Sequence, residues 1–133
     1  MSQDLERSVA EILDGPLPTF PDEPQGSADD GAELVFHGRV RGQEHGRPII
    51  ALDYEYYPEM AADALRKLVD AARERFSVSR LQCWHRVGEV PVGEASLRVR
   101  VLSPHRAETL DCLAWFIDQL KRDVPIWKWA VTA

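Results

Sequence analysis

Two stretches of this sequence carry apolar residues at helical spacing, and each follows two stretches that alternate like β-strands. The cleanest alternation runs from Ala95 to Leu102, where apolar side chains take turns with Ser96, Arg98 and Arg100. Successive side chains of a strand point to opposite faces, so the apolar set faces a core and the polar set faces outward. The order strand, strand, helix, strand, strand, helix predicts an α+β fold, a largely antiparallel sheet with helices packed on one face.

Further strands are predicted over residues 33–41, 49–57 and 78–86, with a loop over 42–48 and a turn-rich connection over 87–94. Gly38 interrupts the first of these strands, which indicates a bulge or a close approach of another backbone.

Prolines mark the start of both predicted helices and the end of the second. Pro58 opens the first, whose apolar stripe contains Met60, Ala61, Ala64, Leu65, Leu68, Val69 and Ala72. Ser103 and Pro104 fit the N-cap and first helical position of the second, which Pro125 ends after about residue 123. Its predicted apolar stripe contains Leu110, Leu113, Ala114, Ile117 and Leu120.

Residues 1–32 form the least regular part of the chain. Leu5, Val9, Ile12 and Leu13 have helical spacing and favour a short amphipathic helix, although residues 7–14 also fit a strand. A segment rich in Pro, Gly and Asp follows and predicts a surface loop. Residues 33–133 are then expected to form a single α+β domain.

The composition limits the class of protein. With 133 residues and a net charge of −6, the chain fits one domain and does not fit a general nucleic-acid binder, which usually carries a basic excess. It has no run of about 20 apolar residues that could span a membrane. The polar N-terminus, MSQDLERS, is not typical of a signal peptide, so we expect a cytoplasmic protein.

A metal site is not expected. Cys83 and Cys112 form no CxxC pair and are predicted to be buried free thiols. His37 and His45 have no cysteine or carboxylate at a recognised zinc spacing.

Basic residues gather around Arg39 and Arg41 and again around Lys121 and Lys128, and these clusters predict a pocket for a small anion. Arg39 and Arg41 flank Val40 on one strand, so both guanidinium groups can bind one anion; a solvated strand edge is the alternative. His105 and Arg106 lie at the start of the last helix, where free N–H groups favour an anion; a surface pair is the alternative.

Lys121 lies at the end of the last helix, where a cation can also simply complement the helix dipole. Lys128 lies between Trp127 and Trp129, and two exposed tryptophans are unfavourable in water. This tail should therefore dock on its own fold or on a partner, and a desolvated lysine there could act as acid or base. His85 fits a hydrogen-bonded structural histidine.

Five segments resemble the large, catalytic subunit of molybdopterin synthase: FHGRVR (36–41), GRPIIALDYEYYPEMA (46–61), HRVGEVPVGEAS (85–96), SPHRAE (103–108) and LKRDVPIWK (120–128). They cover most of residues 33–128 in the same order. The resemblance implies an α/β-hammerhead type of fold, in which residues 7–14 form a strand and residues 33–133 the catalytic domain.

The resemblance also implies an activity. Members of this family transfer two sulfur atoms to cyclic pyranopterin monophosphate, which forms the dithiolene of molybdopterin. The sulfur arrives as a thiocarboxylate on the C-terminal Gly-Gly tail of a small ubiquitin-like partner. The family forms a homodimer flanked by two small subunits, a heterotetramer, and the reaction needs no metal or other cofactor.

The roles implied by the resemblance fall on residues already singled out. Lys121 matches the lysine held to be essential for sulfur transfer, and Lys128 matches the second lysine of the pocket. Substrate binding is implied for Arg39, Val40, Arg41, His105 and Arg106.

The sequence departs from the family after Lys128, because Trp129 and Ala130 replace the usual basic residue and glutamate. A non-catalytic relative that keeps the partner surface, or a small-anion binding module, are therefore the alternatives. His105 and Lys121 are 121 − 105 = 16 residues apart, about 24 Å along one helix. A single site could use both only if two copies of the chain contribute to it.

Overall fold

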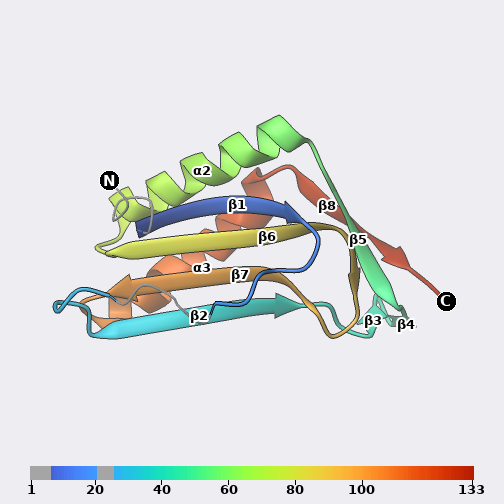
Figure 1. Ribbon diagram of the computed structural model, residues 1–133, viewed down its shortest axis with the longest axis horizontal. Coiled ribbons are helices and arrows are strands. Elements are labelled where there is room, and N and C mark those ends of the chain that lie inside the picture. Colours follow the sequence, from blue (N-terminus) through green and yellow to red (C-terminus); the bar gives the residue numbers. More distant parts are fainter. Residues whose placement is uncertain (1–6, 21–25) are drawn as a thin grey trace.

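The fold is a six-stranded sheet with two helices on one of its faces, in a computed structural model that describes residues 7–20 and 26–133. The sheet order is β2–β7–β6–β5–β8, and β1 also pairs with β6 (Figure 1). The elements are β1 (Ser8–Asp14), β2 (Ala32–Arg39), β3 (Gln43–Glu44), β4 (Arg47–Pro48), β5 (Ala51–Tyr56), α2 (Pro58–Arg75), β6 (Arg80–Pro91), β7 (Ala95–Ser103), α3 (Arg106–Asp123) and β8 (Ile126–Val131). All pairs of the main sheet are antiparallel except β1 with β6, so the predicted α+β class is confirmed.

The long strand β6 changes partner at Gly88. Its first part pairs with β1 as far as Val87, and its last part pairs with β5 from Gly88 onward. Gly88 has a φ of +82°, and a Cβ there would lie 3.0 Å from a carboxylate oxygen of Asp14. The glycine therefore lets the strand turn at a crowded corner. Residues 87–91, expected to be a turn-rich connection, are strand, and only residues 92–94 form the turn.

The N-terminal segment is a strand and not the helix that its spacing favoured. Val9, Ile12 and Leu13 are all partly buried in β1, where their backbones pair with β6. Sheet pairing therefore overrides a short helical pattern, which is weak evidence over so few residues. Leu5, which completed that pattern, lies outside the described residues.

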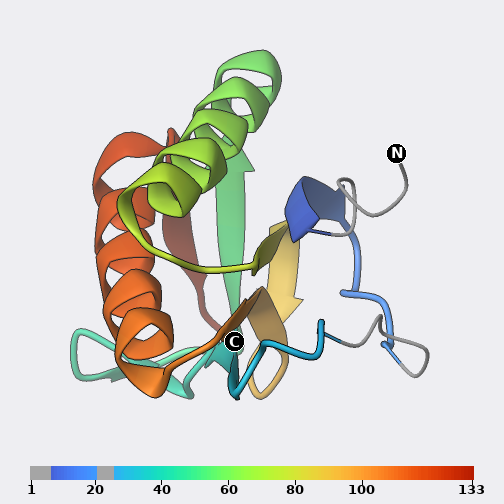
Figure 2. The same cartoon turned by 90° about the vertical axis from the view of Figure 1, so that its left-hand side faces the viewer.

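Both helices pack on the same face of the sheet (Figure 2). In α2 the buried residues are Ala61, Leu65, Leu68, Val69 and Ala72, as the stripe predicted. Met60, also placed in that stripe, is instead 63% exposed. It lies about 100° around the helix from Ala61, and this turns it away from the core.

Helix α3 begins later than the sequence predicted. Its N-cap is His105, whereas Ser103 is the last residue of β7 and pairs with Ala32. Ser103 is fully buried, and its hydroxyl donates a hydrogen bond to the His105 carbonyl over 2.6 Å. Because pairing in the sheet holds Ser103, it cannot act as the helix cap.

The buried face of α3 matches the predicted stripe only in part, at Leu113, Ile117 and Leu120. Thr109, Cys112, Phe116 and Leu120 are buried, whereas Leu110 and Ala114 are exposed. The Thr109 hydroxyl donates to the Arg106 carbonyl over 2.7 Å, which makes its burial acceptable. Two overlapping stripes satisfy the helical period here, and packing against the sheet and α2 selects the one that contains Phe116.

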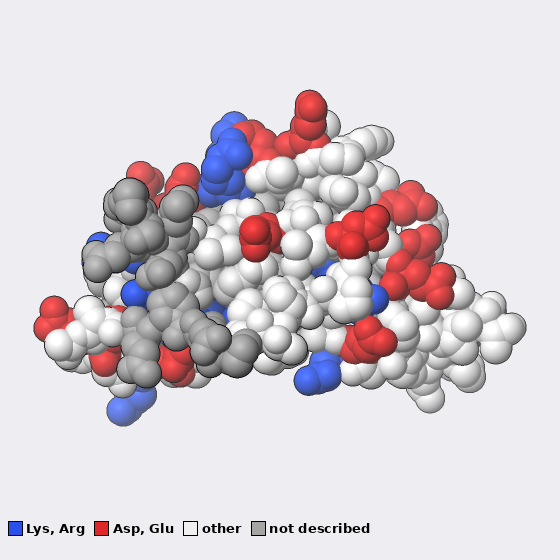
Figure 3. All heavy atoms as spheres, in the orientation of Figure 1, with Lys and Arg blue, Asp and Glu red and all other residues white. Residues whose placement is uncertain are grey.

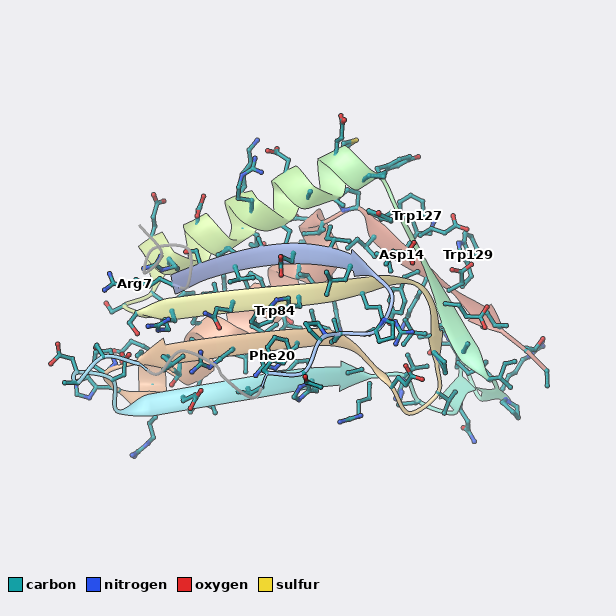
Figure 4. All side chains as sticks on the ribbon, viewed as in Figure 1. Arg7, Asp14, Phe20, Trp84, Trp127 and Trp129 are labelled. Carbon is teal, nitrogen blue, oxygen red and sulfur yellow. The ribbon has the colours of Figure 1, made fainter. Side chains whose placement is uncertain are left out.

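The sheet face opposite the helices carries the arginines that the alternation placed on the outward side. Arg98 and Arg100 are only 4% and 3% exposed. The N-terminal segment crosses this face, and the Phe20 ring lies 3.7 Å from the Arg98 guanidinium and packs on Trp84 (Figure 4). Arg100 donates to the Glu33 carboxylate over 2.7 Å. These arginine side chains therefore point away from the helices, as predicted, but other groups of the chain cover them and they are buried.

On the visible part of the same face, acidic groups are spread out and basic groups are small and separate (Figure 3). Within residues 7–20 and 26–133, no helix is long and apolar enough to cross a membrane.

Candidate functional site

Strands β5 and β8 run across the ends of the other strands (Figure 1). A cavity of about 600 Å³ lies beside them. The C-terminal part of α3 closes one side, and the end of β2 closes another. The residues lining it are Phe36, Gly38, Arg39, Arg41, Tyr54, His85, Ser96, Leu97, Ile117, Leu120, Lys121, Val124, Ile126, Trp127 and Lys128.

Four predicted cationic residues meet in this cavity: Arg39, Arg41, Lys121 and Lys128. The antiparallel pairing of β8 with β5 returns the chain after α3 and sets Lys128 opposite Tyr54. Two basic clusters about 80 residues apart in sequence thus become one cationic pocket, which fits an anionic ligand.

A bulge at Gly38 shapes the β2 side of the cavity. The pairing register with β7 shifts between Gly38 and Arg39, which confirms the predicted irregularity. A Cβ at Gly38 would lie 3.4 Å from Leu97 Cβ, so the neighbouring strand also approaches closely. After the bulge, Arg39 donates a hydrogen bond to the Gly93 carbonyl over 3.0 Å.

Glu44 is a site residue that the sequence reasoning missed. One carboxylate oxygen lies 3.2 Å from Lys128 Nζ, and the other lies 3.9 Å from Arg41 Nη2. Glu44 comes from the β3–β4 hairpin, whose turn residues His45 and Gly46 have φ of 52° and 78°. A His-Gly pair with positive φ at both positions fits a tight hairpin turn. In the sequence, this pair was the signal that could have indicated the hairpin that carries Glu44.

Lys121 differs from Lys128 in its surroundings. It lies on the last turn of α3 beside Leu120 and Val124, both only 5% exposed. Among the described residues it has no ion-pair partner, whereas Lys128 is paired with Glu44. Lys121 is therefore the cation best placed to interact with a bound ligand instead of with the protein.

The inner wall of the cavity is uncharged. The Tyr54 hydroxyl lies 3.1 Å from Ser96 Oγ, which in turn lies 3.5 Å from the Gly38 carbonyl oxygen. His85 is 6% exposed, and its Nδ1 lies 2.9 Å from the Arg86 carbonyl oxygen. Burial lowers the pKa of His85, and the hydrogen bond to Arg86 opposes this effect. The prediction of a hydrogen-bonded histidine is confirmed, but its place in the cavity wall was missed.

Three predicted substrate-binding residues lie away from the cavity. Val40 is 3% exposed in a small core with Leu52 and Val90, and its backbone N–H and carbonyl are bonded to residues 94 and 93. His105 and Arg106 are exposed at the opposite end of α3 from Lys121. One copy of the chain therefore does not bring all the predicted residues together.

The tryptophan-containing tail docks on its own fold as β8. Trp127 lies opposite Glu55 and Trp129 opposite Asp53. They remain 36% and 55% exposed, and both lie along the outermost strand of the sheet (Figure 4). Trp127 contacts the Tyr57 ring edge-on at 5.1 Å. The tail thus pairs with its own sheet and still leaves an exposed apolar surface at Trp127 and Trp129, of which Trp127 lines the cavity.

Metal and thiol chemistry receive no support from the described residues. They contain no group of three or more His, Cys, Asp or Glu side chains that could hold a metal ion. Cys83 and Cys112 are free and buried, as predicted. Burial raises the pKa of both thiols, that of Cys112 to about 11, so neither is a ready nucleophile.

The fold and cavity together define an α+β protein with a cationic, apolar-walled pocket, whose charge suits a small anion. Comparison with known proteins places it further: the chain belongs to the MoaE protein family, whose model matches residues 19–123.

Curated relatives agree with this assignment. The molybdopterin synthase catalytic subunit of Pyrococcus abyssi is 39% identical over 106 residues, 80% of this chain and 72% of that protein. The human molybdopterin synthase catalytic subunit is 42% identical over 98 residues, 74% of this chain and 52% of that protein. The chain thus spans about half the length of the human relative.

Solved structures share the fold. Molybdopterin synthase from Staphylococcus aureus superposes with a TM-score of 0.83 at 30% identity, covering 92% of this chain and 90% of that one. A complex of subunits 1 and 2 of molybdopterin-converting factor from Helicobacter pylori gives a TM-score of 0.71 at 26% identity, covering 90% and 82%.

Proposed function

We propose that this chain is the catalytic subunit of a molybdopterin synthase, which transfers sulfur to cyclic pyranopterin monophosphate. The observation that carries the proposal is the meeting of Lys121, Lys128, Arg39 and Arg41 around one apolar-walled cavity. These cations suit the substrate's phosphate and an incoming thiocarboxylate, and the apolar walls suit its flat ring. Residues 33–133 form the catalytic domain in this proposal.

The sulfur donor is proposed to be a small ubiquitin-like subunit that ends in a Gly-Gly thiocarboxylate. The Helicobacter pylori neighbour is a two-subunit complex, which supports a second chain. The exposed Trp127 and Trp129 beside the cavity offer an apolar surface on which a partner's tail could dock.

The reaction then needs two kinds of help from the protein. The thiocarboxylate sulfur attacks a side-chain carbon of the pterin, and the new C–S bond replaces a C–O bond of that carbon, whose oxygen leaves with its electron pair. Water then hydrolyses the resulting thioester, so that the sulfur stays on the pterin and the carrier leaves with an ordinary carboxylate. Lys121 polarises the thiocarboxylate or moves a proton, because it is free of ion pairs among the described residues. Lys128 and Arg41 hold the anionic groups, and arginine does this without changing charge.

We further propose that the complete site spans two copies of the chain. Helix α3 has 18 residues, so its two ends are about 27 Å apart. His105 and Arg106 of one copy would join Arg41, Lys121 and Lys128 of the other. A two-fold dimer repeats each such contact and so builds two sites. With two carrier subunits the assembly is a heterotetramer.

The decisive experiment is conversion of cyclic pyranopterin monophosphate by this chain and a thiocarboxylated carrier in vitro. Formation of the dithiolene product supports the proposal. Substrate binding without conversion would indicate a non-catalytic relative or a small-anion binding module. We propose a cytoplasmic location, which is consistent with the two free cysteines.

A further inference from the structure

Two side chains in the uncharged wall of the cavity have no part in the chemistry described above. We infer that Tyr54 and His85 determine specificity by accepting hydrogen bonds from ring N–H groups of the substrate. The inference rests on the proposed function, because it assigns residues to the pterin part of that substrate. The cations would then bind the anionic groups of the substrate, while the uncharged wall recognises its ring through hydrogen bonds.

The hydrogen-bond directions at Tyr54 follow from its neighbours. The Gly38 carbonyl can only accept, so Ser96 Oγ uses its one proton there, over a long 3.5 Å. The arrangement that satisfies both contacts has the Tyr54 hydroxyl donating its own proton to Ser96, over 3.1 Å. Its oxygen lone pairs stay available, so Tyr54 presents an acceptor to a ligand in the cavity.

The same reasoning gives the tautomer of the His85 ring. The Arg86 carbonyl also only accepts, so the proton of the neutral ring lies on Nδ1, 2.9 Å away. Nε2 then carries a lone pair, and no hydrogen bond from the described residues reaches it. The ring lies edge-on to Tyr54 with centroids 5.5 Å apart, so the two acceptors belong to one wall.

The remaining walls select a flat ring. Phe36, Leu97, Ile117 and Ile126 surround the same space with apolar surface. A ligand without N–H donors would leave both acceptors unsatisfied once it displaced water, which disfavours its binding. A heteroaromatic ring with N–H groups, such as a pterin, packs against the apolar walls and donates hydrogen bonds to both acceptors.

Three variants test the inference. Tyr54→Phe keeps the ring and removes the acceptor, and Tyr57→Phe is the matched control because Tyr57 is 56% exposed outside the cavity. His85→Gln can place an amide oxygen near the position of Nε2. His85→Asn can keep a donor near the position of Nδ1 for the Arg86 carbonyl but loses the Nε2 acceptor.

The measurement is the Kd of the purified complex for neopterin, a pterin without phosphate, and for inorganic phosphate. We expect Tyr54→Phe to weaken neopterin binding about five- to tenfold, the size of one neutral hydrogen bond, and to leave phosphate binding unchanged. His85→Gln should bind neopterin more tightly than His85→Asn, even if its Tm is lower. If His85 only supports the fold, the variant with the higher Tm will also be the one that binds neopterin more tightly.

The outcomes separate this inference from the proposed function. Wild-type neopterin affinity in both Tyr54→Phe and His85→Asn would overturn the inference, as would the absence of neopterin binding by the unaltered complex at millimolar concentration. Sulfur transfer by the unaltered complex would still stand in either case. Conversely, ring binding that depends on Tyr54, without any sulfur transfer, would overturn the proposed function alone.

Discussion

The two ends of α3 carry the same kind of residue and have opposite surroundings. At the C-terminal end, Lys121 lies in a cavity with three other cations and an apolar wall. At the N-terminal end, His105 and Arg106 are exposed and line no part of that cavity. The difference teaches that a basic residue at a helix end becomes a candidate site only when other elements converge on it. Here β5, β7 and β8 converge on one end, and in the proposed dimer a second copy of the chain would meet the other.

Removing Lys121 should have the largest effect. We expect Lys121→Ala to lower the rate of sulfur transfer by about 10²- to 10⁴-fold, the usual contribution of a proton-transfer group. Lys121→Arg should also be strongly impaired, because arginine does not lose its proton near neutral pH. Turnover assays on the complex measure this, with Lys67→Ala on the exposed face of α2 as the control. Near-normal turnover by either variant would remove Lys121 from the mechanism.

Mixing two inactive variants tests whether the ends of α3 cooperate across a dimer. His105→Ala/Arg106→Ala combined with Lys121→Ala leaves one intact site in each mixed dimer. Equal mixing should therefore restore about a quarter of the unaltered activity. Each variant mixed with itself should stay inactive. Confirmed subunit exchange without recovered activity would show that the two ends do not share a site.

The fold and the site differed in how far the sequence predicted them. The strands and helices after residue 32 were found because their apolar periods are long and regular. The predicted start of α3 was wrong, since Ser103 belongs to β7, and its buried face was predicted only in part, since only packing could choose Phe116 over Leu110. The burial of Arg98 could not be read from alternation, because a distant segment covers it.

Residue patterns alone predicted the site as separate pieces, and only the family resemblance joined Arg41, Lys121 and Lys128 in one pocket. Lys121 and Lys128 were close in sequence to a helix end and two tryptophans, and Arg39 and Arg41 shared a strand. Their meeting depends on the pairing of β8 with β5, which no local pattern encodes. Glu44 and the place of His85 in the cavity wall were missed, since a short-range pattern such as the His45-Gly46 turn indicates a hairpin but not which side chains it brings to the site.

Shortening a tryptophan beside the cavity should affect partner binding more than stability. Trp129 is 55% exposed, so Trp129→Ala loses little packing within the chain. We expect carrier affinity to fall about tenfold, as for an interface tryptophan of moderate importance, while Tm changes little. Calorimetry and thermal melts measure the two effects. Trp84→Ala, at a position 7% exposed, should show the reverse. A large loss of Tm with unchanged affinity at Trp129 would make the tail part of the core.

Neutralising Glu44 should have the smallest effect and the opposite sign. Its carboxylate pairs with Lys128 and lies near Arg41, so it competes with an anionic ligand for both cations. Glu44→Gln should therefore lower the KM for the substrate about two- to fivefold, within the range of a weak ion pair. Glu55→Gln, on the exposed side of β5, is the control. A raised KM would show instead that Glu44 positions Lys128.

The parallel pairing of β1 with β6 has a consequence for folding kinetics. Ser8 and its partner Leu81 are 81 − 8 = 73 residues apart, whereas β6 and β7 are joined by a short turn. Because closing a longer loop costs more chain entropy, β6 and β7 should pair first and β1 should join late. Native-state hydrogen exchange should accordingly find the amides of β1 opening before those of β7, and an opening that also releases Phe20 would briefly uncover Arg98.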